Sequence, residues 1–149
     1  MPEKETLKRA RRDKRQGKAP STQAGEFIRE EIHHIREGKH GATSTKQAIA
    51  IGLSKARRAG VKLGRPPASA TASTKRSAES ASRAGRRHTR PSSTRSRAMR
   101  RKLKREGRSA ASPKALSRHA KSAARARSAA SRRASAKRAA RTRKRRANA

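Results

Sequence analysis

Residues 21–63 read STQAGEFIREEIHHIREGKHGATSTKQAIAIGLSKARRAGVKL, and this stretch decides the fold that the sequence predicts. It is the only part of the chain with a regular helical spacing of large apolar side chains. One helix face is formed by the residues at i, i+4, i+8 and i+11, which are Ala24, Ile28, Ile32 and Ile35. Gly38 is suited to the position at which this helix ends. The pattern therefore predicts a first amphipathic helix.

A second helix is predicted after the polar turn that follows. Ser44-Thr45-Lys46-Gln47 is a capping-box pattern, in which Ser44 caps the helix and Gln47 is its third residue. Gly52 and the alanines of this helix favour close helix packing, and Gly60 suits the position just past its end. Together the two helices predict an αα-hairpin. Its packing side chains are expected to be Ala24, Ile28, Ile32, Ile35, Ile49, Leu53 and Ala56.

The rest of the composition predicts disorder. The chain has 149 residues, 45 Lys and Arg against 9 Asp and Glu, and a formal net charge of +36. Most of its hydrophobic residues are alanine, and Phe27 is the only aromatic residue. Low hydrophobicity with high net charge is typical of chains that cannot bury enough apolar surface to offset the entropy of ordering. We therefore expect a mostly disordered chain with α-helical elements.

Charge and composition divide the chain into four segments. We expect a basic N-terminal arm at 1–20, the hairpin at 21–63, a disordered Ser/Thr/Ala/Arg linker at 64–94 and an Ala/Arg/Lys-rich tail at 95–149. The net charge is +10 over residues 1–65 and +26 over residues 66–149. Like charges at i, i+4 oppose helix formation in the tail. The tail is therefore expected to be helical in part, and mainly when a polyanion neutralises it.

The tail indicates binding to nucleic acid without sequence specificity. Lys and Arg separated by Ala and Ser give a high charge density, and such a chain binds phosphates electrostatically. Aromatic residues that would stack on single-stranded bases are missing from the tail, which favours duplex DNA or structured RNA over single strands. The side chains expected to contact phosphates are Arg11, Arg12, Lys55, Arg57, Arg58, Lys62, Arg65, Arg86, Arg87, Arg100, Arg101, Lys102, Lys104, Arg125, Arg127, Arg132, Arg133, Lys137, Arg138, Arg141, Arg143, Lys144, Arg145 and Arg146.

Two other functions fit the same sequence. An RNA- or ribosome-associated basic protein would have a similar composition. Alternatively, the hairpin would bind a partner protein, and the tail would only localise it. A lone hairpin buries little apolar surface, so we also expect self-association or docking through its Ile/Leu stripe.

Leu63-Gly64-Arg65-Pro66 contains a Gly-Arg-Pro core that resembles the AT-hook. By that resemblance Arg65 would enter the minor groove of A·T tracts, and Lys62 would contact a flanking phosphate. The sequence departs from the pattern, because Leu63 replaces the usual arginine and no basic residues follow the proline. The alternative is an ordinary helix exit into a linker.

Catalytic, metal and membrane functions are not expected. Glu30 and Glu31 are consecutive and do not face one another, and the sequence contains no nucleophile–base pattern or glycine-rich phosphate loop. His33 and His34 diverge by about 100° on a helix, and no cysteine or i, i+4 histidine partner accompanies them or His40, so solvated histidines are favoured over zinc. We therefore expect no cofactor, metal ion or small-molecule substrate.

The location expected for the protein is cytoplasmic and associated with the nucleoid. The segment Met1–Leu7 lacks the apolar region of a secretory signal. Apolar runs of membrane-spanning length are also missing from the sequence.

The hairpin resembles a small bacterial domain of unknown function. The similarity lies in the Glu-Gly-Lys-His-Gly turn at 37–41 and in the Lys-Gln-Ala-Ile-Ala-Ile helix at 46–51. It implies a bacterial origin and no particular activity. In composition, residues 66–149 resemble the C-terminal domains of linker histones and bacterial histone-like proteins, and Ser112-Pro113-Lys114-Ala115 is similar to their Ser-Pro-Lys elements.

Overall fold

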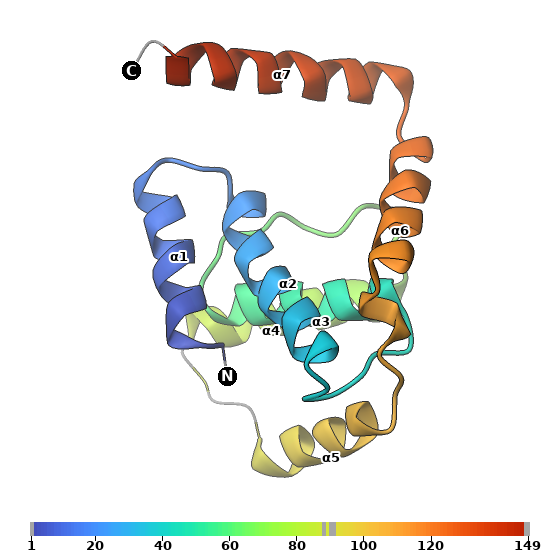
Figure 1. The fold of residues 1–149 in the computed structure, drawn as a ribbon. Helices are drawn as coiled ribbons and strands as arrows, with labels where there is room; N and C mark the ends of the chain where they lie inside the picture. Colours follow the sequence, from blue (N-terminus) through green and yellow to red (C-terminus); the bar gives the residue numbers. More distant parts are fainter. Residues whose placement is uncertain (1, 88, 90–91, 148–149) are drawn as a thin grey trace. The chain divides into compact units, whose positions relative to one another are not determined.

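The computed structural model describes residues 2–87, 89 and 92–147, and within these ranges the secondary structure is helical with no strand (Figure 1). Two units are compact in themselves, Met1–Ser112 and Pro113–Ala149. The first unit contains α1 (Lys4–Arg15), α2 (Pro20–Arg36), α3 (Thr45–Arg58), α4 (Ala72–Arg86), α5 (Ser93–Lys104) and the 3₁₀ turn η1 (Ser109–Ala111). The second contains α6 (Pro113–Arg125) and α7 (Ala129–Ala147).

The expectation of a mostly disordered chain is wrong. That expectation rested on the small number of large apolar side chains. It gave too little weight to alanine, which is the best helix former and permits close packing of helices. Helices α4 and α5 occupy most of the segment predicted as a disordered linker and the start of the tail, and α6 and α7 make the rest of the tail helical in the described residues.

Helix α1 packs along α2 in the segment predicted as a basic arm (Figure 1). Its inner face consists of Thr6, Ala10 and Asp13, all buried. Arg9 Nε donates to Glu26 Oε2 over 2.6 Å and joins the two helices. Gly17 ends α1 with a φ of +67°, a backbone conformation that favours glycine.

The predicted hairpin forms from α2 and α3. Ser44 Oγ accepts a hydrogen bond from the Gln47 amide at 3.2 Å, as in a capping box. Gln47 Oε1 accepts its bond from the amide of Thr43, one residue before the N-cap, at 2.6 Å. Gly38 follows α2 with a φ of +76°, at the position expected from the sequence. A Cβ on Gly52 would lie 2.8 Å from Ile28 Cα, so the two helix backbones approach closely there.

The core lies where α1, α2 and α3 meet. Phe27, Ala24, Ala56 and Ala10 form its buried centre, with Leu7, Leu53, Val61 and Leu63 packed around them. Among the predicted packing residues, Ala24, Ile32, Ile35 and Ala56 are buried, and Ile28, Ile49 and Leu53 are half-buried. Phe27, which is 1% exposed, was not among them because the predicted stripe passed beside it.

Helices α1 and α4 cover the hairpin from two directions, packing on α2 and α3 respectively. Self-association was expected because a lone hairpin would leave its Ile/Leu stripe uncovered. Helices α1 and α4 now provide contacts to the hairpin, so this argument for self-association no longer applies. Self-association itself stays a prediction.

Small residues bring α4 against the end of α3. Ala81 is buried, and a Cβ on Gly85 would overlap the Arg57 carbonyl oxygen. Thr71 caps the helix by accepting a hydrogen bond from the Thr74 amide at 3.2 Å. The packing of α4 therefore rests on close approach and not on large apolar side chains.

Hydrogen bonds tie α5, the segment after it and the turn η1 to the α2–α3 turn and the start of α3. The Gly41 amide donates to the Leu103 carbonyl at 2.8 Å, and the Ala42 amide donates to the Gly107 carbonyl at 3.0 Å. Thr45 Oγ1 donates to the Ala110 carbonyl at 2.7 Å in a buried position. These contacts fix the turn that contains His40.

A buried ionic group joins α2 to α3. Lys55 Nζ lies 3.0 Å from Glu30 Oε1 and 2.6 Å from Glu31 Oε2, and both carboxylates are 1% exposed. The amide of Glu3, just before α1, donates to Glu30 Oε2 at 2.9 Å. Burial alone would raise the pKa of Glu30, but the hydrogen bonds from Glu3 and Lys55 outweigh it and lower that pKa. Burial would lower the pKa of Lys55, but the two carboxylates raise it instead.

Lys55→Met is expected to lower the free energy of unfolding at pH 7 by about 3–5 kcal/mol, because it leaves two buried carboxylates without their cation. Urea denaturation of the full chain measures the change, and the exposed Lys46→Met on the same helix is the control. The pKa of Glu30 is lower in the folded protein than its ordinary value of 4.5. The ionised Glu30 therefore stabilises the folded protein fully at pH values above 4.5, and this stabilisation is lost as the pH falls through the lower pKa of the folded state. The gap between the wild type and Lys55→Met should therefore narrow in acid, and a constant gap would contradict this account.

Two glycines in the hairpin are expected to respond to alanine in opposite directions. Gly52→Ala forces α2 and α3 apart and should cost about 1–3 kcal/mol of unfolding free energy. A Cβ at Gly25 in α2 meets no atom within 4 Å. Gly25→Ala should therefore stabilise the protein by about 0.5–1 kcal/mol, through helix propensity. Thermal unfolding followed by circular dichroism measures both variants, and equal effects would rule out the close approach.

Candidate nucleic-acid interface

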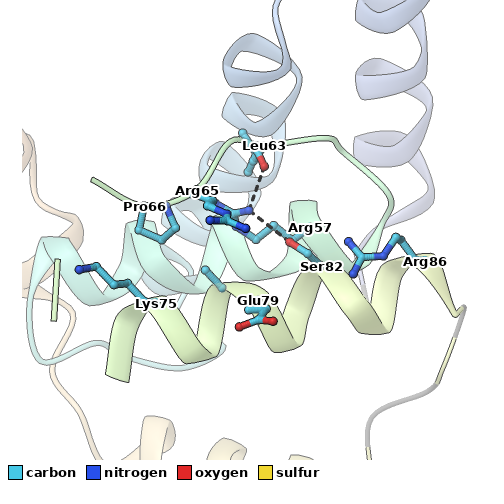
Figure 2. A pocket seen from close by; sticks show the side chains of 9 residues that line it. Arg57, Leu63, Arg65, Pro66, Lys75, Glu79, Ser82 and Arg86 are labelled. Carbon is cyan, nitrogen blue, oxygen red and sulfur yellow. Dashed lines mark hydrogen bonds between the residues drawn. The ribbon is translucent and has the colours of Figure 1, made fainter. Parts of the chain in front are cut away.

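A basic cleft of about 580 Å³ lies in the first unit between α3, the segment after it and α4. Figure 2 shows the cationic side chains that line it, which come from three different parts of the chain: Arg57, Arg65, Lys75 and Arg86. Glu79 is the one acidic side chain among the lining residues. The cleft therefore presents more positive than negative charge to solvent.

Arg57 holds the cleft in shape. Its Nη1 donates to the Leu63 carbonyl at 3.1 Å and to Ser82 Oγ at 3.2 Å, as drawn in Figure 2. Its Nη2 donates to the Gly64 carbonyl at 2.7 Å. One guanidinium thus ties α3 to the Leu63–Gly64 backbone and to α4, a use that suits its planar set of donors. Arg57 has a structural role beyond the one expected from its charge.

The same contacts explain why the Gly-Arg-Pro core departs from the AT-hook pattern. Leu63 stands where that pattern has an arginine, and it packs against the core cluster. The Gly64 carbonyl is held by Arg57, so this backbone is anchored to the helices. Arg65 itself is exposed at the cleft. The geometry favours a helix exit that is packed in place and presents a single arginine.

The other cations of the cleft are exposed to solvent: Arg65, Lys75 and Arg86. Lys75 Nζ also donates a hydrogen bond to the Ala68 carbonyl at 2.6 Å. Glu79 lies 3.2 Å from Arg83, so its charge is partly compensated by a residue outside the cleft lining. Lys75 was not among the predicted contacts, because nothing in its local sequence places it near Arg65. Lys75 and Arg86 both lie on α4, and the α3–α4 crossing places this helix beside the segment that contains Arg65.

In the second unit, α6 carries a straight line of cations. Lys114, Arg118, Lys121 and Arg125 follow a 4-3-4 spacing, which puts them on one helix face, and all four are exposed. This set is called the α6 stripe. It extends over roughly 16 Å at the α-helical rise. Only Arg125 was among the predicted contacts, although the 4-3-4 spacing of the other three is visible in the sequence once the helix is known to begin at Pro113.

Helix α7 carries charge on all sides. Nine of its 19 residues are Lys or Arg. The described basic side chains are exposed, and they are Arg132, Arg133, Lys137, Arg138, Arg141, Arg143, Lys144 and Arg145. Arg146 lies in α7, but its side chain is outside the described residues. Arg127 precedes the helix and hydrogen-bonds Ser131 Oγ at 3.3 Å. In the second unit the sequence contains no Asp or Glu to neutralise these cations.

The remaining predicted contacts lie on the first unit, and all but one are exposed. Exposed side chains are found on α1, α5 and the ends of α3 and α4: Arg11, Arg12, Arg58, Lys62, Arg87, Arg100, Arg101, Lys102 and Lys104. The exception is Lys55. Because its ammonium lies between Glu30 and Glu31, it holds the helices together and does not face a phosphate. The prediction for Lys55 is corrected on this ground.

Acidic residues are gathered in the first unit and are mostly paired there. All nine precede residue 113 in the sequence. Eight of them form ion pairs within 4.0 Å among the described side chains. These pairs involve seven of the Lys and Arg side chains: Lys8, Arg9, Lys18, Arg29, Lys39, Lys55 and Arg83. The charges that face outward are therefore overwhelmingly positive.

Residues 4–67 match a family of unknown function (DUF6496). The match begins at the start of α1 and ends at Pro67, so it extends the resemblance seen at residues 21–63 in both directions. No curated protein and no solved structure matches the chain. The resemblance of residues 66–149 to histone-like tails is not supported by these comparisons.

Among the described residues, no helix combines the length and the apolar character that a membrane span requires.

Arg57→Met is expected to release the Leu63–Gly64 backbone, because it removes three hydrogen bonds and keeps most of the side-chain volume. Amide hydrogen exchange at residues 61–65 should become faster, with a modest loss of about 1–3 kcal/mol in unfolding free energy. Arg86→Met, which removes an exposed cation from the same cleft, is the control and should leave that exchange unchanged. Equal exchange in both variants would show that Arg57 does not anchor the segment.

Proposed function

We propose that the protein binds duplex DNA without sequence specificity and associates with the nucleoid, through phosphate contacts made mainly by α6 and α7. The observation that carries this proposal is the α6 stripe, with its four exposed cations on one helix face. A helix with such a line of charges matches a row of phosphates, because each cation that neutralises a phosphate releases a condensed counterion.

The charge balance of the second unit supports the same function. Residues 113–149 contain 14 Lys and Arg and no acid, so their net charge is +14. Like charges at i, i+4 on a helix repel one another, and a polyanion relieves this repulsion. The basic cleft at Arg65, Lys75 and Arg86 adds a second group of cations in the first unit.

Burial of the only aromatic residue favours a duplex over a single strand. Proteins that hold single strands stack bases on exposed aromatic side chains. Phe27 is 1% exposed and belongs to the core, so it offers no such surface. Readout through phosphates alone also fits non-specific binding, since phosphate contacts carry no sequence information.

The decisive measurement is the salt dependence of DNA binding by the full chain. Replacing the stripe with Lys114→Gln, Arg118→Gln, Lys121→Gln and Arg125→Gln should reduce the slope of log K against log salt by about 3.6, for four lost phosphate contacts on B-DNA. Fluorescence anisotropy with a labelled duplex, titrated at several salt concentrations, gives the slope. An unchanged slope would place the interface elsewhere.

A charge-conserving variant separates the geometry of the stripe from its charge. Arg118→Ala with Ala123→Arg, and Lys121→Ala with Ala120→Lys, move the two cations around α6 by about 140° and about 100°, at about 100° per residue. Ala120 and Ala123 are exposed, so the exchange disturbs no buried contact. The slope should fall between those of the wild type and the four-Gln variant. A slope equal to the wild type would mean that charge alone, without alignment, determines binding.

Competition distinguishes the alternatives. Duplex DNA, duplex RNA and single strands of equal length are tested against the labelled duplex. Preference for RNA would replace the proposal with the RNA- or ribosome-associated function. Absence of salt-dependent binding to every nucleic acid would leave the adaptor function, in which the first unit binds a protein.

A further inference from the structure

Three side chains of the first unit lie together and take no part in the DNA interface: Glu31, His34 and His40, called here the triad. Each offers a ligand atom, and these atoms all lie within 4.8 Å of one another. Glu31 and His34 are three residues apart on α2, and His40 lies in the turn before α3. The two imidazole rings meet edge to face, with centroids 6.2 Å apart.

Glu31 is poised for a cation. Its side chain is 1% exposed, and both carboxylate oxygens are buried. Lys55 Nζ lies 2.6 Å from Oε2, and this contact with Glu31 raises the pKa of Lys55 against the effect of burial. Oε1 has only His40 Nε2, at 3.1 Å, and accepts no hydrogen bond from the described residues. A buried carboxylate oxygen without a hydrogen bond is costly. A metal ion at Oε1 would satisfy this oxygen, and Lys55 would keep Oε2.

Each histidine has one ring nitrogen directed to an oxygen acceptor. His34 Nε2 lies 2.8 Å from Glu3 Oε1, and His40 Nδ1 lies 3.0 Å from the Gly41 carbonyl. Histidines that ligate metals almost always donate their second N–H to a carboxylate or carbonyl in this way, which fixes the tautomer and the ring orientation. The arrangement leaves Nδ1 of His34 and Nε2 of His40 for a ligand.

The local charge suits a divalent cation, in contrast to the chain as a whole. Ion pairs link the triad to Glu3, Glu30 and Glu37, and to Lys39 and Lys55. Arg9 and Arg29 line the same pocket as Glu3, Glu30, Glu37 and His34, and both pair with Glu26. With Glu31 and Glu26 included, five carboxylates face four cationic side chains, which leaves a balance of −1 when both imidazoles are neutral. Few other acids are available in a chain that has only nine.

We propose that Glu31, His34 and His40 bind one divalent transition-metal ion, with zinc as the fitting ion. Two imidazoles and one carboxylate are ligands that Zn²⁺ accepts, with a fourth position left for water. His40 Nε2 and Glu31 Oε1 are 3.1 Å apart, close to the distance of about 3.3 Å between two ligands of a tetrahedral zinc ion. Both rings are 14% exposed, which gives the ion access from solvent.

Sequence reasoning missed this site because it compared the histidines only with one another. The adjacent pair His33 and His34 does diverge, and His33 is exposed. The signal lay in Glu31 and His34, a Glu-x-x-His spacing that places a carboxylate and an imidazole on one helix face. The third ligand depends on tertiary structure, because α5 and the segment after it fix the turn through the amides of Gly41 and Ala42.

The test uses the full chain stripped of metal by a chelator and titrated with Zn²⁺ against a chromophoric competitor, without DNA. One ion per chain is expected. His34→Gln and His40→Gln should each weaken binding by more than about 100-fold, since loss of an outer partner alone costs about 10–100-fold. Glu3→Gln, which removes the partner of His34, should weaken it about 10-fold.

Two control variants test whether the effect is specific to the triad, and one measurement on the wild type tests the ligands directly. His33→Gln and His119→Gln remove histidines outside the triad and should leave the affinity unchanged. X-ray absorption of the zinc-loaded wild type should show two imidazoles and light-atom ligands, and this result does not depend on any variant folding. Absence of saturable Zn²⁺ binding, equal affinity of His40→Gln and His33→Gln, or fewer than two imidazoles on the ion would overturn the proposal. Loss of DNA binding would leave this result unaffected.

Discussion

The burial of Lys55 between Glu30 and Glu31 is the constraint on which the first unit depends. Two consecutive carboxylates face the interior, where an ionised carboxylate is stable only with a cation and hydrogen bonds. Lys55 meets both, and the Glu3 amide completes the environment of Glu30. The group therefore sets how α1, α2 and α3 meet.

The same ionic group separates the two activities proposed for the protein. Because Lys55 occupies Oε2 of Glu31, Oε1 faces His40 and the triad takes shape. Because Lys55 is held inside, it is removed from the set of cations that face outward. Acidic residues concentrate around this interior, and the second unit is left with basic residues alone. The first unit thus has a cluster of buried and partly buried acidic side chains around the triad. In the second unit, the charged side chains of both helices are all positive.

Much of the hairpin could be predicted from residues 21–63. The stripe from Ala24 to Ile35, the capping box at Ser44 and the helix-ending Gly38 depend on neighbours within a few positions, and such local signals survive in any tertiary setting. Helix α4 could not be predicted in this way. It packs through Ala81 and Gly85, and a small residue at a crossing looks the same in the sequence as a small residue in a linker. The α6 stripe falls between these cases, since its spacing is in the sequence but has meaning only for a helix that starts at Pro113.

By itself, the sequence determined the charge of the chain, the absence of acid beyond residue 112, the hairpin and the chemical types available for a site. The tertiary structure decided which charges are free to meet a ligand and which are used inside. In the folded chain Lys55 is buried between two carboxylates, Arg57 donates to the Leu63 and Gly64 carbonyls, and His40 lies near Glu31 and His34. The physical reason is distance along the chain. Charge and helical periodicity are properties of neighbouring residues, whereas these pairings join residues 6 to 25 positions apart in different elements of the fold. No local pattern specifies a crossing.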